Sequence, residues 1–193
     1  MDSAITPRSH VLVVYFSHDG QTTKIARRIV ETLRDCGLDA ALADGGSPQI
    51  GREIGTHQAV VIGAAVRFGH HLPEAEALVR QNAARLAARP GAFFSVSLAA
   101  AGDDKQHQEA QRLADEFLAR TGWKPRQVAI VAGALRYREY NFFLRIVMRL
   151  IAAKAGRDTD TSRDYVYTDW AAVDRFARDF ARALGLPGEV KAH

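Results

Sequence analysis

The sequence predicts an α/β protein in which helices cover both faces of a five-stranded parallel sheet. Apolar runs alternate along the chain with segments of helical periodicity, the order expected of strands joined by crossover helices. The apolar runs are nearly continuous, as in AVVIGAAV, whereas strands with one face in water alternate apolar and polar residues. The length of 193 residues, with 47% hydrophobic and 25% charged residues, predicts a single domain over residues 1–193.

The expected elements follow one another in a regular order. Strands are expected at 10–17, 38–43, 59–66, 92–100 and 127–135. Helices are expected at 21–35, 72–88, 106–121 and 169–184, with a short helical turn near 50–54. Because a crossover connection returns the chain to the same end of the sheet, the strands are expected to run parallel.

The first and last helices show amphipathic patterns. In the first, Ile25, Ile29 and Leu33 recur every four residues, and basic residues occupy the opposite, solvated face. In the last, one apolar stripe is expected to pack on the sheet, with Thr168 as the N-cap. The residues of this stripe are Trp170, Val173, Phe176, Ala177 and Phe180.

An inserted segment, about residues 136–165, separates the last strand from the last helix. It combines apolar side chains with arginines, and those expected to bind a substrate or a membrane are Arg136, Arg138, Arg145 and Arg149. A basic amphipathic segment suits a membrane interface, and this one is too short to cross a bilayer core of about 30 Å. The alternative is a helix packed on its own domain or on a second copy of the chain in a homo-oligomer.

Composition narrows the possible partners and location. The net charge of +4 favours an anionic partner, which could be a phosphate, a membrane surface or a nucleic acid. No apolar signal segment or membrane-spanning stretch is present, so a cytoplasmic location is expected. The single cysteine, Cys36, excludes an internal disulfide and a cysteine-rich zinc site, and it is expected to be a buried apolar residue.

The loop SHDGQTT, residues 17–23, joins the first strand to the first helix. Such a loop presents free backbone N–H groups and the positive end of a helix dipole, which together attract phosphate. Gly20 allows a tight turn, and Ser17, Thr22 and Thr23 can add hydroxyl donors. Neither the ATPase phosphate loop nor the G-x-G-x-x-G dinucleotide loop is present, so those two classes are disfavoured.

The loop resembles the first loop of the flavodoxin-like family, which holds the phosphate of flavin mononucleotide (FMN). In that family it reads roughly Ser/Thr-x-Thr-Gly-x-Thr, and here residues 17–22 read SHDGQT. The resemblance implies FMN as the cofactor and a flavodoxin-like sheet with strand order 2-1-3-4-5. Asp19 replaces the usual threonine, and we expect its carboxylate to turn away from the phosphate and cap N–H groups of the loop or helix.

Two more loops at carboxyl ends of strands are expected to converge on the same point. In the loop at residues 64–71, Phe68 can stack on the flavin ring, Gly69 lets the backbone approach it, and Arg67 adds positive charge. The loop at 97–104 has no aromatic residue, so one face of the flavin is expected to be open to a substrate. The adjacent histidines at 70–71 have no carboxylate or cysteine cluster near them, and no metal site is expected.

These three loops supply the expected FMN-binding residues. They are Ser17, His18, Asp19, Gly20, Gln21, Thr22, Val66, Arg67, Phe68, Gly69, His70, Ser97, Leu98 and Ala99.

Motifs across nearly the whole chain narrow the resemblance to the menaquinone-dependent protoporphyrinogen IX dehydrogenase family. The motifs, in chain order, are S-x-D-G-Q-T at 17–22, VIGAAVRFGHH at 61–71, AGALRYREY at 132–140, DTDT at 158–161 and YTDW at 167–170. The aspartate at position 19 belongs to the pattern of this branch.

This narrower resemblance implies an FMN enzyme of haem biosynthesis. It would remove six electrons from protoporphyrinogen IX and pass them to a membrane quinone, menaquinone or ubiquinone, at the cytoplasmic face of the inner membrane. Because the flavin carries the redox chemistry, no catalytic protein residue is expected. The arginines of the insertion would attract the propionates of the tetrapyrrole.

Three other readings stay open on the sequence alone. A flavodoxin that only carries electrons is one, although such carriers are usually acidic and this chain is basic. An NAD(P)H:quinone reductase of the same fold is the second. A nucleic-acid-binding module is the least favoured, because the basic residues are interleaved with aliphatic ones and no recognised motif is present, so no nucleic-acid partner is expected.

Overall fold

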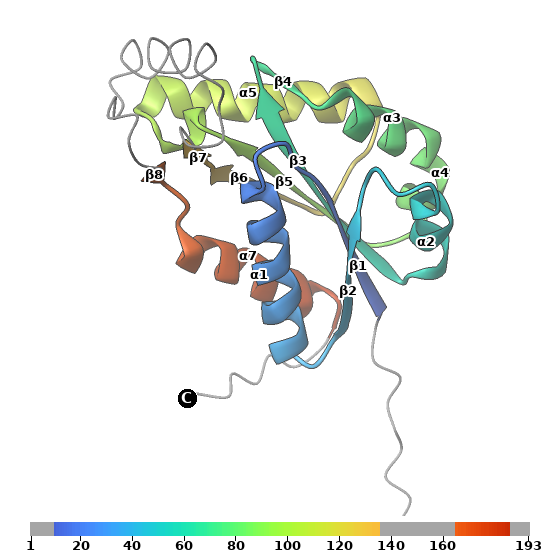
Figure 1. The fold of residues 1–193 in the computed structure, drawn as a ribbon. Helices are drawn as coiled ribbons and strands as arrows, with labels where there is room; N and C mark the ends of the chain where they lie inside the picture. The colour runs from blue at the N-terminus through green and yellow to red at the C-terminus, as the bar shows by residue number, and fades with distance from the viewer. Residues whose placement is uncertain (1–9, 136–164, 186–193) are drawn as a thin grey trace, which may run out of the picture.

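The computed structural model describes residues 10–135 and 165–185 of the chain. Its main sheet contains five long parallel strands in the spatial order β2-β1-β3-β5-β6 (Figure 1), which is the predicted order 2-1-3-4-5. The bounds of these strands are β1 His10–Phe16, β2 Asp39–Asp44, β3 Ala59–Arg67, β5 Gly91–Ser97 and β6 Gln127–Ala132. The flavodoxin-like α/β class predicted from the sequence is therefore confirmed.

Short strands that the sequence did not predict accompany the sheet. β4 (His70–His71) pairs antiparallel with the end of β3, so residues 66–71 form a hairpin. The fifth long strand ends at Ala132 rather than at Leu135, because β7 (Ala134–Leu135) leaves the sheet and pairs with β8 (Tyr165–Val166).

Helices cover both faces of the sheet (Figure 1). α1 and α7 lie side by side on one face, and α2 to α5 cover the other. The bounds are α1 Gln21–Asp35, α2 Ile50–Thr56, α3 Pro73–Gln81, α4 Ala83–Ala87, α5 Asp104–Thr121 and α7 Trp170–Ala183, with a 3-10 turn, η1, at Ala99–Ala101. The short turn predicted near 50–54 is thus a helix of seven residues.

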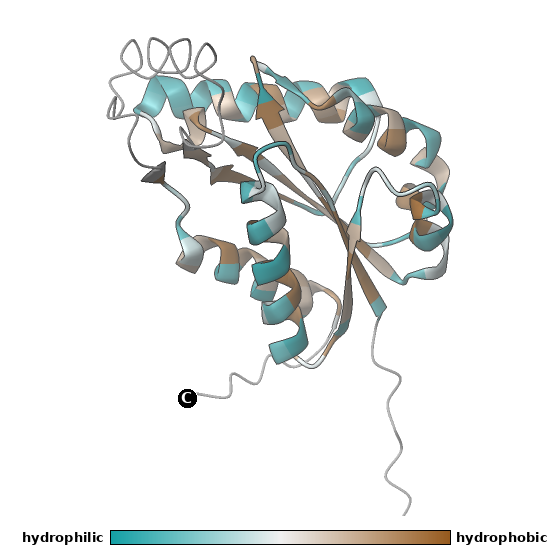
Figure 2. Cartoon of the chain, in the orientation of Figure 1, coloured by the Kyte–Doolittle hydropathy of each residue, from teal (hydrophilic) through white to brown (hydrophobic). Residues whose placement is uncertain are grey.

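Two hydrophobic cores follow from this layering, one on each face of the sheet. Brown apolar strands in Figure 2 lie between helices whose outward faces are teal. The face under α1 and α7 buries Ile25, Ile29 and Leu33, the predicted stripe of the first helix. Because β1, β3 and β5 are buried from both sides, their sequences read as continuous apolar runs.

Three local predictions were wrong. The helix expected at 72–88 breaks at Asn82, whose side-chain amide donates to the backbone oxygen of Leu78, so α3 and α4 are separate. The N-cap of α7 is Asp169 rather than Thr168, because the Asp169 carboxylate accepts from the backbone N–H of Ala172. Trp170 is 38% exposed and does not belong to the buried stripe.

The basic insertion predicted at about 136–165, with Arg136, Arg138, Arg145 and Arg149, lies outside the described residues except for its last residue. Within the described ranges, none of the helices has the length and apolar character needed to span a membrane.

Candidate functional site

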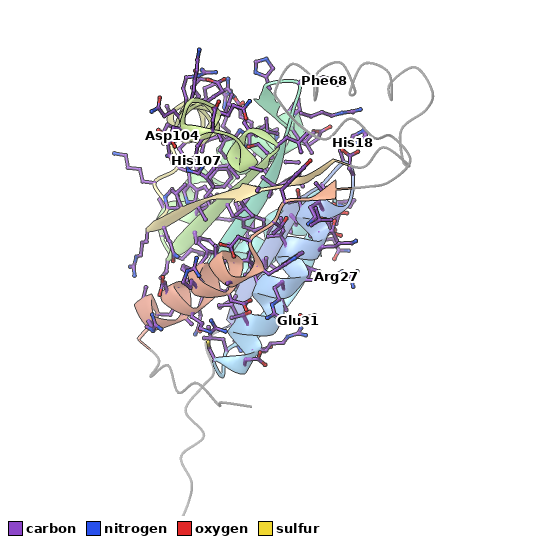
Figure 3. The ribbon with its side chains drawn as sticks, turned by 90° about the vertical axis from the view of Figure 1, so that its left-hand side faces the viewer. His18, Arg27, Glu31, Phe68, Asp104 and His107 are labelled. Atoms are coloured by element: carbon purple, nitrogen blue, oxygen red, sulfur yellow. The ribbon has the colours of Figure 1, made fainter. Side chains whose placement is uncertain are left out.

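The loops after β1, β3, β5 and β6 meet at the carboxyl ends of the parallel strands and enclose a cavity of about 300 Å³. Figure 3 shows His18 and Phe68 at this same end of the molecule, although they come from different loops. The cavity therefore lies where the order of strands reverses between β1 and β3, the usual ligand position in open α/β sheets.

Most of the predicted site residues line this cavity. They are Ser17, His18, Asp19, Gln21, Thr22, Val66, Arg67, Phe68, Gly69, Ser97, Leu98 and Ala99. Gly20 and His70 do not line it: Gly20 serves the turn of the first loop, and the side chain of His70 is exposed on β4.

The β1–α1 loop has the features of an anion site. Gly20 is the N-cap of α1 with φ of 75°, a left-handed conformation that favours glycine. The N-cap residue Gly20 has no side chain to cap this end of α1, so within the described residues the first N–H groups are available to a ligand. The Ser17 hydroxyl oxygen is buried and has no hydrogen-bond partner among the residues that the structure describes, which is costly unless a ligand supplies one. The loop therefore fits a phosphate group.

A polar chain links the first loop to the second across the cavity. An Arg67 guanidinium nitrogen lies 2.6 Å from Nε2 of His18, and Nδ1 of the same ring lies 2.7 Å from an Asp19 carboxylate oxygen. Because arginine can only donate, His18 accepts at Nε2 and donates from Nδ1 to Asp19. The Asp19 carboxylate is thus engaged with His18, whereas the N-cap of α1 is Gly20.

The β3–β4 hairpin places an aromatic ring at the rim of the cavity. Arg67 pairs with His70, so Phe68 and Gly69 form a two-residue loop with φ values of 51° and 80°. Positive φ at both positions is the type I′ turn, which normally contains asparagine, aspartate or glycine. Phe68 nevertheless occupies the first position with 65% of its surface exposed. It is the only described residue other than glycine with positive φ.

His71 anchors this hairpin in the core below α5. Its ring lies 4.9 Å from the ring of Phe117 and 5.7 Å from that of Phe93, and Nε2 lies 2.9 Å from the Ser95 hydroxyl. Burial, with a smaller contribution from the positive charge of Arg120, lowers the pKa of His71 to about 4. The imidazole is therefore neutral at physiological pH and belongs to the scaffold of the site.

The far side of the cavity contains small or aliphatic side chains. Leu98 and Ala99 follow β5 and enter η1, which begins where the backbone N–H of Ala100 donates to the Ser97 hydroxyl. Further lining residues that the sequence did not predict come from α5 and from the segment that follows β6, namely Glu109, Leu113, Gly133 and Ala134. Glu109 and Leu113 lie four residues apart on one helix face, a spacing that does not distinguish them from other helix residues.

The residues of this site fit a flat phosphorylated ligand. An uncapped helix end and a serine hydroxyl are at one end, and an aromatic ring is at the rim. Nowhere in the described residues do three histidine, cysteine or acidic side chains gather as a metal site would require. The fold and this site together define a flavodoxin-like protein.

Comparisons with known proteins agree. The chain matches the flavodoxin domain family over residues 12–162. Protoporphyrinogen IX dehydrogenase (quinone) of Escherichia coli strain K12 is 36% identical over 179 residues, which cover 91% of this chain and 97% of that protein. The protein of the same name from Leishmania major is 37% identical over 188 residues, covering 94% of this chain and 79% of that protein. The chain therefore belongs to the protoporphyrinogen IX dehydrogenase (quinone) family of flavodoxin-domain proteins.

Solved structures support the fold alone. Oxidised flavodoxin 2 from Bacillus cereus superposes with a TM-score of 0.57 at 18% identity, covering 91% of this chain and 99% of that one.

Proposed function

We propose that the chain is an FMN-dependent enzyme that oxidises protoporphyrinogen IX to protoporphyrin IX and reduces a membrane quinone, menaquinone or ubiquinone. The observation that carries the proposal is the cradle at the β1–α1 loop, where an uncapped helix end meets the buried Ser17 hydroxyl. The family membership, at 36% identity over 91% of the chain, supports the substrate class.

Different residues of the cavity would bind the phosphate and the ring system of FMN. Ser17, Thr22 and the first N–H groups of α1 would hold the phosphate, since hydroxyl and amide donors complement its charge. Phe68 would stack on the ring system from the rim, with the guanidinium of Arg67 4.9 Å from the centre of the Phe68 ring. Bound FMN would accept the hydride equivalents that the substrate loses.

The third loop would leave room for the substrate. Leu98 and Ala99 are small compared with an aromatic residue, so a flat tetrapyrrole could approach the flavin from that side. The oxidation removes six electrons and six protons from protoporphyrinogen IX, and each quinone takes two of each to become a quinol. The chain supplies position and exclusion of water in this scheme, and no protein nucleophile is needed.

The test is anaerobic turnover of the purified protein. The protein is expected to be yellow, with absorbance near 450 nm, and to release FMN rather than a dinucleotide when denatured. Mixed with protoporphyrinogen IX and a quinone, it should raise porphyrin fluorescence. A pure electron carrier would leave fluorescence unchanged, and an NAD(P)H:quinone reductase would bleach its flavin with NADPH within seconds; either outcome would overturn the proposal.

The arginines of the insertion lie outside the described residues, and we propose that they bind the substrate propionates or anionic lipid. Arg138, Arg145 and Arg149 replaced together by glutamate should lower turnover and binding to anionic vesicles while flavin content stays the same. Unchanged turnover and vesicle binding would remove the insertion from the mechanism.

A further inference from the structure

The YTDW motif, residues 167–170, reaches the cavity through a hydrogen-bonded side chain. Thr168 is 8% exposed and lies between the end of β8 and the start of α7. Its hydroxyl oxygen lies 2.6 Å from the backbone oxygen of Ala132 and 2.9 Å from Nε2 of Gln21. Gln21 is the first residue of α1 and lines the cavity. One buried hydroxyl thus joins the last strand of the sheet to the ligand loop.

The direction of these hydrogen bonds is fixed by chemistry. A backbone carbonyl can only accept, so the single hydroxyl proton of Thr168 is donated to Ala132. The hydroxyl then has only acceptor capacity left for Gln21, and the NH₂ group of the Gln21 amide must face it. With the amide turned the other way, two oxygens would face each other without a proton between them.

The consequence is that the amide oxygen of Gln21 remains for a ligand. Gln21 is 5% exposed, and its buried Oε1 has no hydrogen-bond partner in the part of the chain that the structure describes. A buried carbonyl oxygen left in this state is unfavourable, and the cavity that Gln21 lines is where a partner can enter. Because Oε1 can only accept, that partner must be a donor.

We propose that Thr168 is a positioning residue that fixes the Gln21 amide so that its oxygen accepts a hydrogen bond from a ligand hydroxyl. A phosphate dianion carries no proton to donate, so Gln21 selects for the sugar-alcohol part of the ligand and the phosphate is left to Ser17 and the helix end. This deepens the proposed function and rests on it, since in FMN the ribityl chain carries such hydroxyls. The motif that opens α7 therefore contributes to ligand specificity, besides its structural role.

The experiment compares two ligands by flavin fluorescence titration of the apoprotein. One is FMN, and the other is an isoalloxazine with an unbranched five-carbon phosphate chain that lacks the ribityl hydroxyls. Thr168→Val is expected to weaken FMN binding about fivefold, as for one lost neutral hydrogen bond, and to leave the binding of the deoxy analogue unchanged. Thr168→Ser should restore the wild-type preference for FMN.

Two further variants separate positioning from stability. Thr32→Val is the matched control: Thr32 also joins α1 to α7, by a hydrogen bond of 3.1 Å to Asp174, but it lies eleven residues along α1, about 16 Å from Gln21. It should leave the affinity for both ligands unchanged. Gln21→Leu removes the acceptor directly and should abolish the preference for FMN even if Thr168→Val folds poorly.

The inference would be overturned if Thr168→Val weakened both ligands equally, if Thr32→Val had the same effect, or if Gln21→Leu kept the preference for FMN. If the wild-type protein binds FMN and Thr168→Val keeps the same preference for FMN over the deoxy analogue, only this inference is overturned. A wild-type protein that binds neither flavin overturns the proposed function as well.

Discussion

Two loops face each other across the cavity, and they meet the same backbone requirement in opposite ways. The β1–α1 loop needs a left-handed residue and has Gly20 there, with φ of 75°. The turn of the β3–β4 hairpin needs two, and the first of them is Phe68, with φ of 51° and 65% of its surface exposed. A residue with a β-carbon in this conformation costs about 1–2 kcal/mol. The first loop therefore adopts this backbone without strain, whereas the second accepts strain and exposes an aromatic ring at the rim of the cavity.

The strongest way to break the first loop is Gly20→Val. A β-branched side chain at this φ is strained, and it would crowd the helix end that is expected to hold phosphate. We expect FMN affinity to fall by about a hundredfold or more, which corresponds to ~3 kcal/mol of lost binding. Absorbance of the purified protein near 450 nm and a titration with FMN measure this effect.

Gly37 provides the control for that experiment. It follows α1 at its far end with φ of 87° and has no atom close to the position of an added β-carbon. Gly37→Val should lower the melting temperature about as much as Gly20→Val does, but it should leave the affinity for FMN unchanged. Loss of FMN in both variants would show that the effect of Gly20→Val is general instability.

A substitution at Phe68 in the second loop should raise stability, whereas Gly20→Val in the first loop should lower it. Phe68→Asn relieves the left-handed strain, so the apoprotein should gain about 1 kcal/mol, or roughly 2–4 °C in melting temperature. The same change removes the stacking ring, and FMN affinity should fall about tenfold. Thermal unfolding and fluorescence titration together test the pair of effects. A variant that is both less stable and equally tight in binding would contradict this account of Phe68.

Because His71, which anchors the hairpin, has a lowered pKa, we expect the stability of the protein to depend on pH. Burial lowers the pKa of His71 from 6.5 to about 4, so as the pH falls below 6.5 the unfolded chain takes up a proton before the folded one does. Stability is therefore retained above pH 6.5 and lost as the pH falls toward 4, by at most ~1.4 kcal/mol per pH unit. His71→Gln should flatten this part of the stability profile in urea titrations. Parallel profiles of the two proteins would show that His71 is not responsible.

Loss of the Arg67–His18 hydrogen bond, which links the two loops, should have the smallest effect on FMN affinity. Arg67 is bonded to His18 and packs over Phe68, and such exposed contacts are worth about 0.5–1 kcal/mol. Arg67→Gln should weaken FMN binding about threefold, measured by titration at low salt. Arg80→Gln on α3 is a matched exposed change away from the cavity and should have no effect.

The sequence predicted the parts of the structure that follow from periodicity. Continuous apolar runs gave the five strands and their parallel direction, and the spacing of Ile25, Ile29 and Leu33 gave the buried face of α1. The sequence did not predict the helix break at Asn82, because asparagine also occurs inside helices. Only the hydrogen bond from its side-chain amide to the Leu78 backbone oxygen marks the end of α3. The two candidates for the cap of α7 are adjacent, and residue type alone could not choose Asp169 over Thr168.

The sequence predicted which loops form the site, but it did not predict which contacts their individual residues make. Ser17 and Thr22 in the first loop, and Phe68 with Gly69 in the second, were predicted from the sequence and line the cavity. Sequence could not show that Arg67 bonds to His18, or that Thr168 bonds to Gln21, because both contacts depend on how separate elements are placed. Glu109 and Leu113 escaped because a helix face next to a loop reads the same as any amphipathic face.

The hydrogen bond between Gln21 and Thr168 joins residues 147 positions apart in the chain. At a synthesis rate of about 5–20 residues per second, roughly 7–30 s separate the appearance of the two on the ribosome. Throughout that interval the nascent chain has Gln21 but lacks the Thr168 hydroxyl that we propose orients its amide. Full affinity for the cofactor should therefore be reached only after residue 168 has been synthesised and has packed against α1.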